Sequence, residues 1–186
     1  MRKLVVYTLM SLDGAVDEPG RYFTPGLAFD QEPEFDAVMD DYEAKMTATQ
    51  DAVLLGRNMY DEWSGYWPKL SNHPFADFIN GIKKFVITSR PLVSEWNNTE
   101  AVQGPIERLV PDLKSRPGGD IGVHGSITLA QSLLAAGLVD ELRLVVGPAV
   151  GFSGRRLFSG DDPRRLELLH VTPTPSGSVL LAYRVH

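Results

Sequence analysis

Apolar runs alternate with amphipathic stretches along nearly the whole chain. Short apolar runs predict buried strands, and stretches with an apolar residue every three to four positions predict helices. The predicted strands cover residues 3–10, 51–55, 85–88, 120–123 and 141–146, and the predicted helices cover 34–49, 106–114 and the stretch from Gly125-Ser126 to Gly137. Gly56 to Tyr60 is expected to begin a further helix. This alternation favours an α/β architecture.

The last part of the chain has a different pattern. Residues 165–171 and 178–185 alternate between apolar and polar positions around Pro173-Thr174-Pro175-Ser176-Gly177, which predicts a closing antiparallel hairpin. We therefore expect a mixed, mostly parallel central sheet with helices on both faces. Residues 11–33 form a long predicted loop, and loops of that length often contact ligands.

Composition narrows the function classes. A length of 186 residues fits one domain over residues 1–186, and a net charge of −6 opposes binding to nucleic acid. The absence of cysteine excludes disulfides, thiolate nucleophiles and cysteine-ligated zinc, and the four histidines are scattered, so we expect no metal site. The first apolar run is too short to cross a membrane, so we expect a cytoplasmic protein.

Three predicted strand ends share one design, in which an apolar strand runs into glycine or small polar residues. They are Leu55-Gly56-Arg57-Asn58, Thr88-Ser89-Arg90 and Val123-His124-Gly125-Ser126. Ligands of open parallel sheets lie outside the carboxyl ends of the strands, so the three are expected to meet in one crevice. Glycines, a helix N-terminus and arginines suit a dinucleotide phosphate. Taken singly, each segment also fits a tight turn, a helix start or a surface arginine.

Two other segments leave alternatives open. Ser11-Leu12-Asp13-Gly14 follows the first strand and either holds a polar heterocycle or forms an ordinary Asp-Gly turn, the reading that the residues alone favour. The stretch with Trp63, Tyr66, Trp67 and Pro68 is interpreted as an aromatic loop that lines a substrate pocket or a dimer contact, or that simply packs.

Together these segments resemble the dihydrofolate reductase-like superfamily, in the branch of the reductase domain of bacterial riboflavin biosynthesis. The resemblance covers nearly the whole chain. It rests on Ser11 to Gly14, Leu54 to Tyr60, Val86 to Ser89, and the run from Val123 to Leu142 that continues to Pro148 and Leu157-Phe158. It implies a three-layer dihydrofolate reductase-like fold and an NADPH site.

The resemblance also implies roles for individual residues. The cofactor-binding residues it implies are Gly56, Arg57, Asn58, Thr88, Ser89, Arg90, Gly122, His124, Gly125, Ser126 and Ile127. Ser89 and Arg90 are expected beside the adenosine 2′-phosphate, and the helix start at Gly125 beside the pyrophosphate. Ser11, Asp13, Gly14 and Trp67 are expected at the substrate, with Asp13 and Asp40 as candidate catalytic residues. Asp36, Asp40 and Asp41 lie on one acidic predicted helix, where most are expected to be solvated.

The implied activity is hydride transfer from NADPH to a small heterocycle, pteridine-like or ribosylaminopyrimidine-like, as in 5-amino-6-(5-phosphoribosylamino)uracil reductase. An alternative keeps the fold without the chemistry, as a catalytically silent NADP-binding or regulatory homodimer. A purely structural domain is a third reading. The superfamily suggests a homodimer, and we expect a small-molecule substrate with neither nucleic acid nor membrane as a partner.

Overall fold

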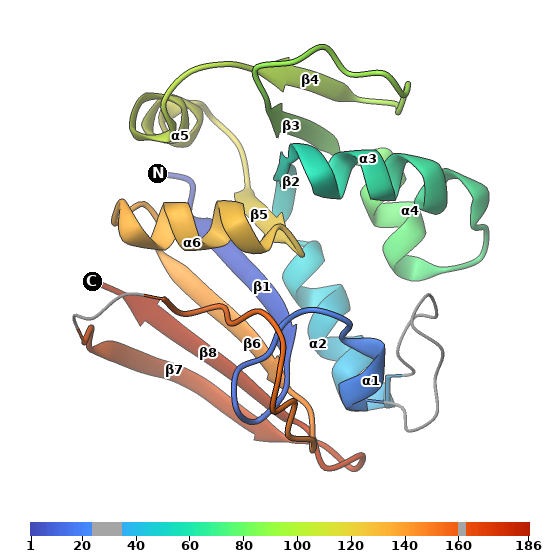
Figure 1. Ribbon diagram of the computed structural model, residues 1–186, viewed down its shortest axis with the longest axis vertical. Helices are drawn as coiled ribbons and strands as arrows, with labels where there is room; N and C mark the ends of the chain where they lie inside the picture. Colours follow the sequence, from blue (N-terminus) through green and yellow to red (C-terminus); the bar gives the residue numbers. More distant parts are fainter. Residues whose placement is uncertain (24–34, 160–162) are drawn as a thin grey trace.

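An eight-stranded mixed sheet forms the middle of the computed structural model, which describes residues 1–23, 35–159 and 163–186 (Figure 1). The strands are β1 (Leu4–Met10), β2 (Gln50–Gly56), β3 (Lys83–Ile87), β4 (Thr99–Val102), β5 (Asp120–His124), β6 (Glu141–Val146), β7 (Leu166–Pro173) and β8 (Val179–Val185). The helices are α1 (Gly20–Phe23), α2 (Ala37–Thr47), α3 (Arg57–Tyr66), the 3₁₀ helix η1 (Trp67–Lys69), α4 (Pro74–Gly81), α5 (Ile106–Ser115) and α6 (Ile127–Ala135). The strand order is β4-β3-β2-β5-β1-β6-β8-β7.

Strand β1 lies near the centre of the sheet and pairs in parallel with β5 and β6. Its sequence, LVVYTLM, is almost continuously apolar, as expected for a parallel strand that is covered on both faces. Successive side chains point to opposite faces. Val6 is paired with Val123 of β5, and Tyr7 with His124, so Tyr7 and His124 are neighbours on one face.

Helices cover both faces of the sheet. Leu113 of α5 and Leu133 of α6 belong to the apolar cluster on the face of Val6. On the other face, Met39 of α2 packs with Tyr7, while α3 and α4 pack on β2 and β3 through a cluster that includes Tyr60 and Ile79. Figure 1 shows α6 on the near side of the sheet and α2 behind it. The predicted three-layer, mostly parallel α/β fold is confirmed.

The predicted C-terminal hairpin is also confirmed. Strand β8 lies between β6 and β7 and is antiparallel to both. In the turn, the Thr174 N–H donates to the Ser178 carbonyl at 2.9 Å, and the Gly177 N–H donates to the Thr174 carbonyl at 3.0 Å. Gly177 has φ +86°, which favours glycine because other residues are strained there.

The aromatic segment that was expected to be a loop is mostly helical. Trp63 and Tyr66 lie in α3, Trp67 and Pro68 begin η1, and Pro74 is the first residue of α4. These helices are too short for their periodicity to be distinct in the sequence, although a proline at the first helical position is a known start signal. The loop prediction for this segment was therefore wrong.

Other boundaries differ less. The predicted loop 11–33 contains the short helix α1, and residues 24–33 of that loop lie outside the described residues, as does Glu34 of the predicted helix 34–49. Strand β4 was not predicted, because its four residues at the sheet edge alternate weakly and none is fully buried. Within the described ranges, every helix is too short or too polar to cross a membrane.

Asp36 joins the start of α2 to the C-terminal hairpin, and it is not one of the solvated acids that the sequence suggested. One carboxylate oxygen accepts the N–H groups of Val38 and Met39 at 3.0 and 3.1 Å, and the other accepts the Ser176 N–H at 3.0 Å. Burial opposes ionisation, but hydrogen bonds from Ser176, Met39 and Thr174 outweigh it and lower the pKa of Asp36 to about 2.

We expect Asp36→Ala to lower the free energy of unfolding at pH 7 by about 1–2 kcal/mol, because a helix cap is lost. The pKa of Asp36 is below its unfolded value of about 3.9, so its stabilisation is present above that pH and is lost as the pH falls toward 2. Urea unfolding at several pH values should show that the free energies of unfolding of the parent protein and Asp36→Ala converge in acid. Asp41→Ala is the control, since Asp41 is exposed and pairs only with Lys45. If the difference in free energy of unfolding between the parent protein and Asp36→Ala did not depend on pH, this explanation would be contradicted.

Candidate functional site

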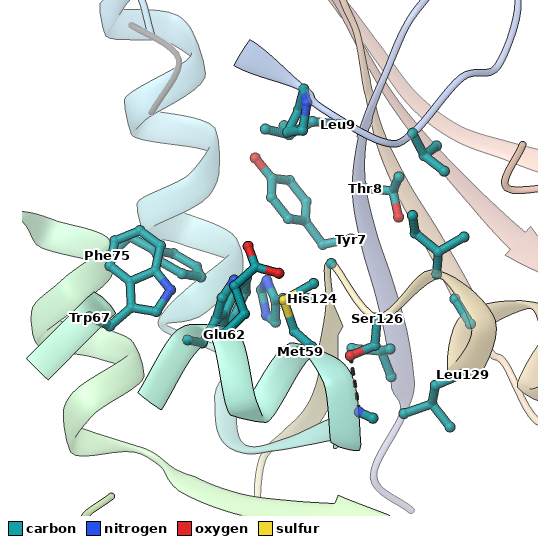
Figure 2. Close-up of a pocket in the computed structure, with 18 of the residues that line it drawn as sticks. Tyr7, Thr8, Leu9, Met59, Glu62, Trp67, Phe75, His124, Ser126 and Leu129 are labelled. Carbon is teal, nitrogen blue, oxygen red and sulfur yellow. Dashed lines mark hydrogen bonds between the residues drawn. The ribbon is translucent and has the colours of Figure 1, made fainter. Parts of the chain in front are cut away.

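A large cavity of about 1810 Å³ lies along the carboxyl ends of β1, β2 and β5 and extends between α2 and the pair α3 and α4. Figure 2 shows the labelled residues that line it. Of the sequence-predicted residues, seven of the cofactor group line this cavity: Gly56, Arg57, Asn58, His124, Gly125, Ser126 and Ile127. The parallel pairing β2–β5–β1 places these segments side by side.

The starts of α3 and α6 are linked at this edge of the sheet. Ser126 occupies the N-cap position of α6, as predicted, but its hydroxyl caps no N–H of that helix. It accepts the Gly56 N–H from the end of β2 at 3.1 Å, the bond drawn dashed in Figure 2. Gly125 has φ +65°, and a Cβ there would lie 3.0 Å from Cε of Met59. No side chain of the N-cap residue therefore caps the first turn of α6, in which the Ile127 N–H donates to the Gly125 carbonyl at 2.9 Å.

Arg57 connects this cavity to a second one. Its guanidinium contacts both carboxylate oxygens of Asp61, at 2.7 and 2.8 Å, and donates to the carbonyl oxygens of Arg90 and Pro91 at 3.3 and 2.8 Å. These bonds hold the segment after β3 against the start of α3. Arg57 is not the free surface arginine that its local sequence also allowed.

The third predicted strand end lines the smaller cavity, of about 400 Å³, between the ends of β3 and β4. Thr88, Ser89 and Arg90 line it, and Arg57 contributes to both cavities. The Thr88 hydroxyl accepts the Arg90 N–H at 3.1 Å, which fixes the turn after β3. The Arg90 side chain is exposed and makes no ion pair within the described part of the chain. The structure thus brings all three strand ends to one edge of the sheet.

His124 is buried, and its ring lies away from the helix start, among the aromatic side chains. Its Nε2 lies 2.8 Å from Oε1 of Gln50, while Nδ1 has no hydrogen-bond partner among the described residues. Burial lowers the pKa of His124 to about 3, so the imidazole is neutral at pH 7. With Nε2–H donating to Gln50, Nδ1 is an acceptor. The side chain therefore adds no positive charge for a phosphate.

Gly122 does not line the cavity, in contrast to the prediction. It lies inside β5, where a Cβ would be 2.0 Å from Oε1 of Gln50 and 2.6 Å from Nε2 of His124. Its lack of a side chain makes room for the hydrogen bond between those two residues. Gly122 thus positions His124 from within the sheet.

Ser11, Asp13 and Gly14 are likewise not among the described residues that line the cavity. The Asp13 carboxylate accepts the Ser11 hydroxyl at 2.6 Å and the N–H groups of Gly151 and Phe152 at 2.7 and 3.0 Å. Hydrogen bonds from Ser11 and Gly151, together with Arg156, hold the pKa of Asp13 well below its usual range. Asp13 is therefore ionised and fully engaged in fixing the loop 151–156, which leaves it no proton to donate.

Asp40 and Trp67 do line the cavity, as predicted, but they come from opposite walls, α2 and η1. Sequence reasoning offered Trp63 and Trp67 as the lining of a substrate pocket, but it missed the other side chains that line the part of the cavity between those walls. We call this part the aromatic chamber and define it by Tyr7, Trp63, Trp67, Phe75, Phe78 and His124. A further signal for it in the sequence was Tyr7, a phenol in an otherwise aliphatic buried strand.

Comparisons with known proteins show the family to which the chain belongs. A profile of the RibD C-terminal domain family matches residues 2–180, so the chain belongs to this family. It is 32% identical over 139 residues to the uncharacterised protein YyaP of Bacillus subtilis, covering 72% of this chain and 73% of YyaP.

Two solved structures extend the comparison to the fold. A putative riboflavin biosynthesis protein from Shewanella has a TM-score of 0.72 at 17% identity and covers 99% of both chains. A dihydrofolate reductase from Enterococcus faecalis, solved with NADP(H) and RAB-propyl, has a TM-score of 0.63 at 14% identity and covers 99% of this chain and 96% of its own. The fold is thus that of the dihydrofolate reductase-like proteins.

The neutral state of His124 makes a testable prediction about stability. Because its pKa falls from about 6.5 in the unfolded chain to about 3 in the folded one, the unfolded state binds an extra proton between these values. Stability is therefore lost as the pH falls through this window. Between pH 7 and pH 5, we expect the free energy of unfolding of His124→Gln to fall by about 2 kcal/mol less than that of the parent protein. Urea unfolding at both pH values, with the exposed His170→Gln as control, measures this difference; equal losses in all three proteins would refute it.

Proposed function

We propose that this protein is an NADPH-dependent reductase that transfers a hydride to a small heterocyclic substrate, pteridine-like or ribosylaminopyrimidine-like. The observation that carries the proposal is the meeting of three strand ends, with two helix starts and two arginines, at one edge of a parallel sheet. Family membership and a fold shared with a dihydrofolate reductase solved with NADP(H) support it.

The residues at this edge fit such a cofactor. The start of α6, where Gly125 has a conformation that favours glycine and Ser126 caps no N–H, suits the pyrophosphate, because a helix N-terminus attracts anions. Arg90 suits the 2′-phosphate, since its side chain is exposed and unpaired beside the smaller cavity. The main cavity, about 1810 Å³, is larger than a single small ligand needs, so a substrate fits beside the nicotinamide.

NADPH supplies the hydride, and the protein supplies position and polarity. A proton must also reach the substrate. We assign the carboxyl of Asp40 to hold that proton, because it lines the cavity on α2 whereas Asp13 does not. Tyr7 lies on the same side, and burial together with Glu43 raises the pKa of its phenol well above the ordinary value. Tyr7 therefore stays protonated.

Arg90→Ala is expected to weaken NADPH binding about tenfold or more and to leave NADH binding unchanged, since a charge-assisted hydrogen bond contributes about 1.5–3 kcal/mol. Calorimetric titration with each nucleotide measures the effect. Arg184→Ala is the matched control, because Arg184 lies on the C-terminal hairpin and pairs with Glu167. Equal weakening toward both nucleotides would contradict the assignment of the 2′-phosphate.

Turnover separates a reductase from a silent binder. With NADPH bound, loss of absorbance at the reduced nicotinamide band should follow the addition of a pteridine or aminopyrimidine substrate, and Asp40→Asn should slow it. NADPH binding without consumption by any such ring would favour the non-catalytic alternative. Absence of binding of both nucleotides to folded protein would overturn the proposal.

A further inference from the structure

Arg155 is a charged residue on the wall of the main cavity that belongs to none of the three strand ends. It lies in the loop between β6 and β7, and its side chain is exposed. Its Nη2 donates to the hydroxyl of Thr128, the second residue of α6, at 2.7 Å. Its Nη1 and Nε form no hydrogen bond within the described part of the chain. The guanidinium therefore lies at the start of α6 with donors to spare.

The charges around the main cavity make this arginine distinctive. Arg57 and Arg155 are the arginines among the described lining residues, which include no lysine, and Arg57 is paired with Asp61. Arg155 forms no ion pair within the described ranges, although Asp17 lies beside its neighbour Gly154. Carboxylates on the same lining come from Asp17, Glu18, Asp40, Asp41, Glu43 and Glu62. An anion in this largely acidic cavity therefore needs a cation that is not already paired, and Arg155 provides one.

The backbone of Arg155 is held from two sides. Its carbonyl oxygen accepts the Val16 N–H at 2.9 Å, and the next residue, Arg156, forms a β-bridge with Ala15. On the other side, the Gln131 side chain of α6 donates to the Arg156 carbonyl at 2.7 Å. Figure 1 shows this loop beside the segment that follows β1. Because the guanidinium extends from a fixed segment, less conformational entropy is lost when it binds a ligand.

Asp13 holds the same loop both before and after Arg155. Its carboxylate accepts the N–H groups of Gly151 and Phe152, and it forms an ion pair with Arg156 at 2.9 Å. Phe152 has φ +54°, a backbone conformation that is strained for a residue with a side chain. Such a conformation persists where surrounding contacts enforce it, and the bonds to Asp13 are contacts of that kind. The place of Arg155 at the cavity therefore depends on Asp13.

We propose that Arg155 binds a pyrophosphate group at the start of α6, and that Asp13 is its positioning residue. A pyrophosphate group carries negative charge on oxygens that a guanidinium can contact with two parallel N–H donors. That this group belongs to NADPH rests on the proposed function. The assignment adds a cation from outside the three strand ends, and it gives Asp13 a part in ligand binding in place of proton transfer.

Calorimetric titration of the whole protein with NADPH, NADH and inorganic pyrophosphate tests Arg155. Arg155→Gln should weaken the binding of both nucleotides about tenfold and by the same factor, because both contain a pyrophosphate and lose the same charge-assisted bond. Arg155→Lys keeps the charge, so it should bind both nucleotides more tightly than Arg155→Gln does. Unchanged nucleotide affinity in Arg155→Gln would overturn the proposal.

Arg164→Gln is the matched control. Arg164 is also exposed, and it donates to the carbonyl oxygens of Leu134 and Ala135 at the other end of α6, at 2.5 and 3.2 Å. This variant should bind both nucleotides as the parent protein does. Equal weakening by Arg164→Gln and Arg155→Gln would show a general effect of net charge and would refute the assigned contact.

A double-mutant cycle tests the role of Asp13. Asp13→Asn keeps the size of the side chain and removes the charge that holds the loop, so it should weaken nucleotide binding several-fold. In the Arg155→Gln background the same change should cause no further loss, because Asp13 acts through Arg155. A role in stability alone would give losses that multiply, and that result would contradict the positioning role.

The pyrophosphate titration distinguishes this proposal from the proposed function. If neither nucleotide binds, but pyrophosphate binds the parent protein and binds Arg155→Gln about tenfold more weakly, the reductase assignment fails and the anion site stands. If both nucleotides bind the parent protein and Arg155→Gln equally, the reductase assignment stands and the anion site fails. Absence of binding of all three probes to folded protein would overturn both.

Discussion

Parallel pairing of β2 with β5, and of β5 with β1, determines where the parts of the site lie. In a parallel sheet the carboxyl ends of neighbouring strands share one edge, and here that edge holds the starts of both α3 and α6. The hydrogen bond from the Gly56 N–H to the Ser126 hydroxyl fixes one helix start against the other. Because the Ser126 hydroxyl is used in this way, it does not cap the first turn of α6.

The pairing of β1 with β5 also places residues of the aromatic chamber side by side. Tyr7 and His124 are opposite one another on adjacent strands and face the side of the sheet that α2, α3 and α4 cover. Gly122 leaves room for Gln50 to bond His124, which orients the imidazole, while burial keeps it neutral. The sheet therefore carries two helix starts at its edge and a group of aromatic rings on one face.

Much of this arrangement could be predicted from the sequence because it depends on local patterns. Strand ends with Gly56-Arg57, Ser89-Arg90 and Gly125-Ser126 are visible as composition changes after apolar runs, and the sheet brings all three to one edge. The closing hairpin was visible because residues alternate around Pro173 to Gly177. These features need only neighbouring residues and the general rules of sheet topology.

The remainder depends on contacts between distant residues, which a single sequence does not reveal. Asp13 was placed at the substrate because it follows the first strand, yet it bonds to Gly151 and Phe152, more than a hundred positions away. Gly122 was expected at the pyrophosphate because of the family resemblance, and the steric role that it has beside Gln50 and His124 was not visible in the sequence. The aromatic chamber collects residues from β1, β5, α3, η1 and α4, and only the fold brings them together.

The central claim is that the edge of the sheet where α3 and α6 begin binds the phosphates of a nicotinamide cofactor, with the aromatic chamber beside it. A crystal structure of the protein with NADPH tests it most directly. The account predicts the pyrophosphate at the start of α6, the 2′-phosphate beside Arg90, and the aromatic chamber still free for a second ligand. Adenine or nicotinamide stacked among Trp67, Phe75 and His124, with no phosphate at the start of α6, would contradict it.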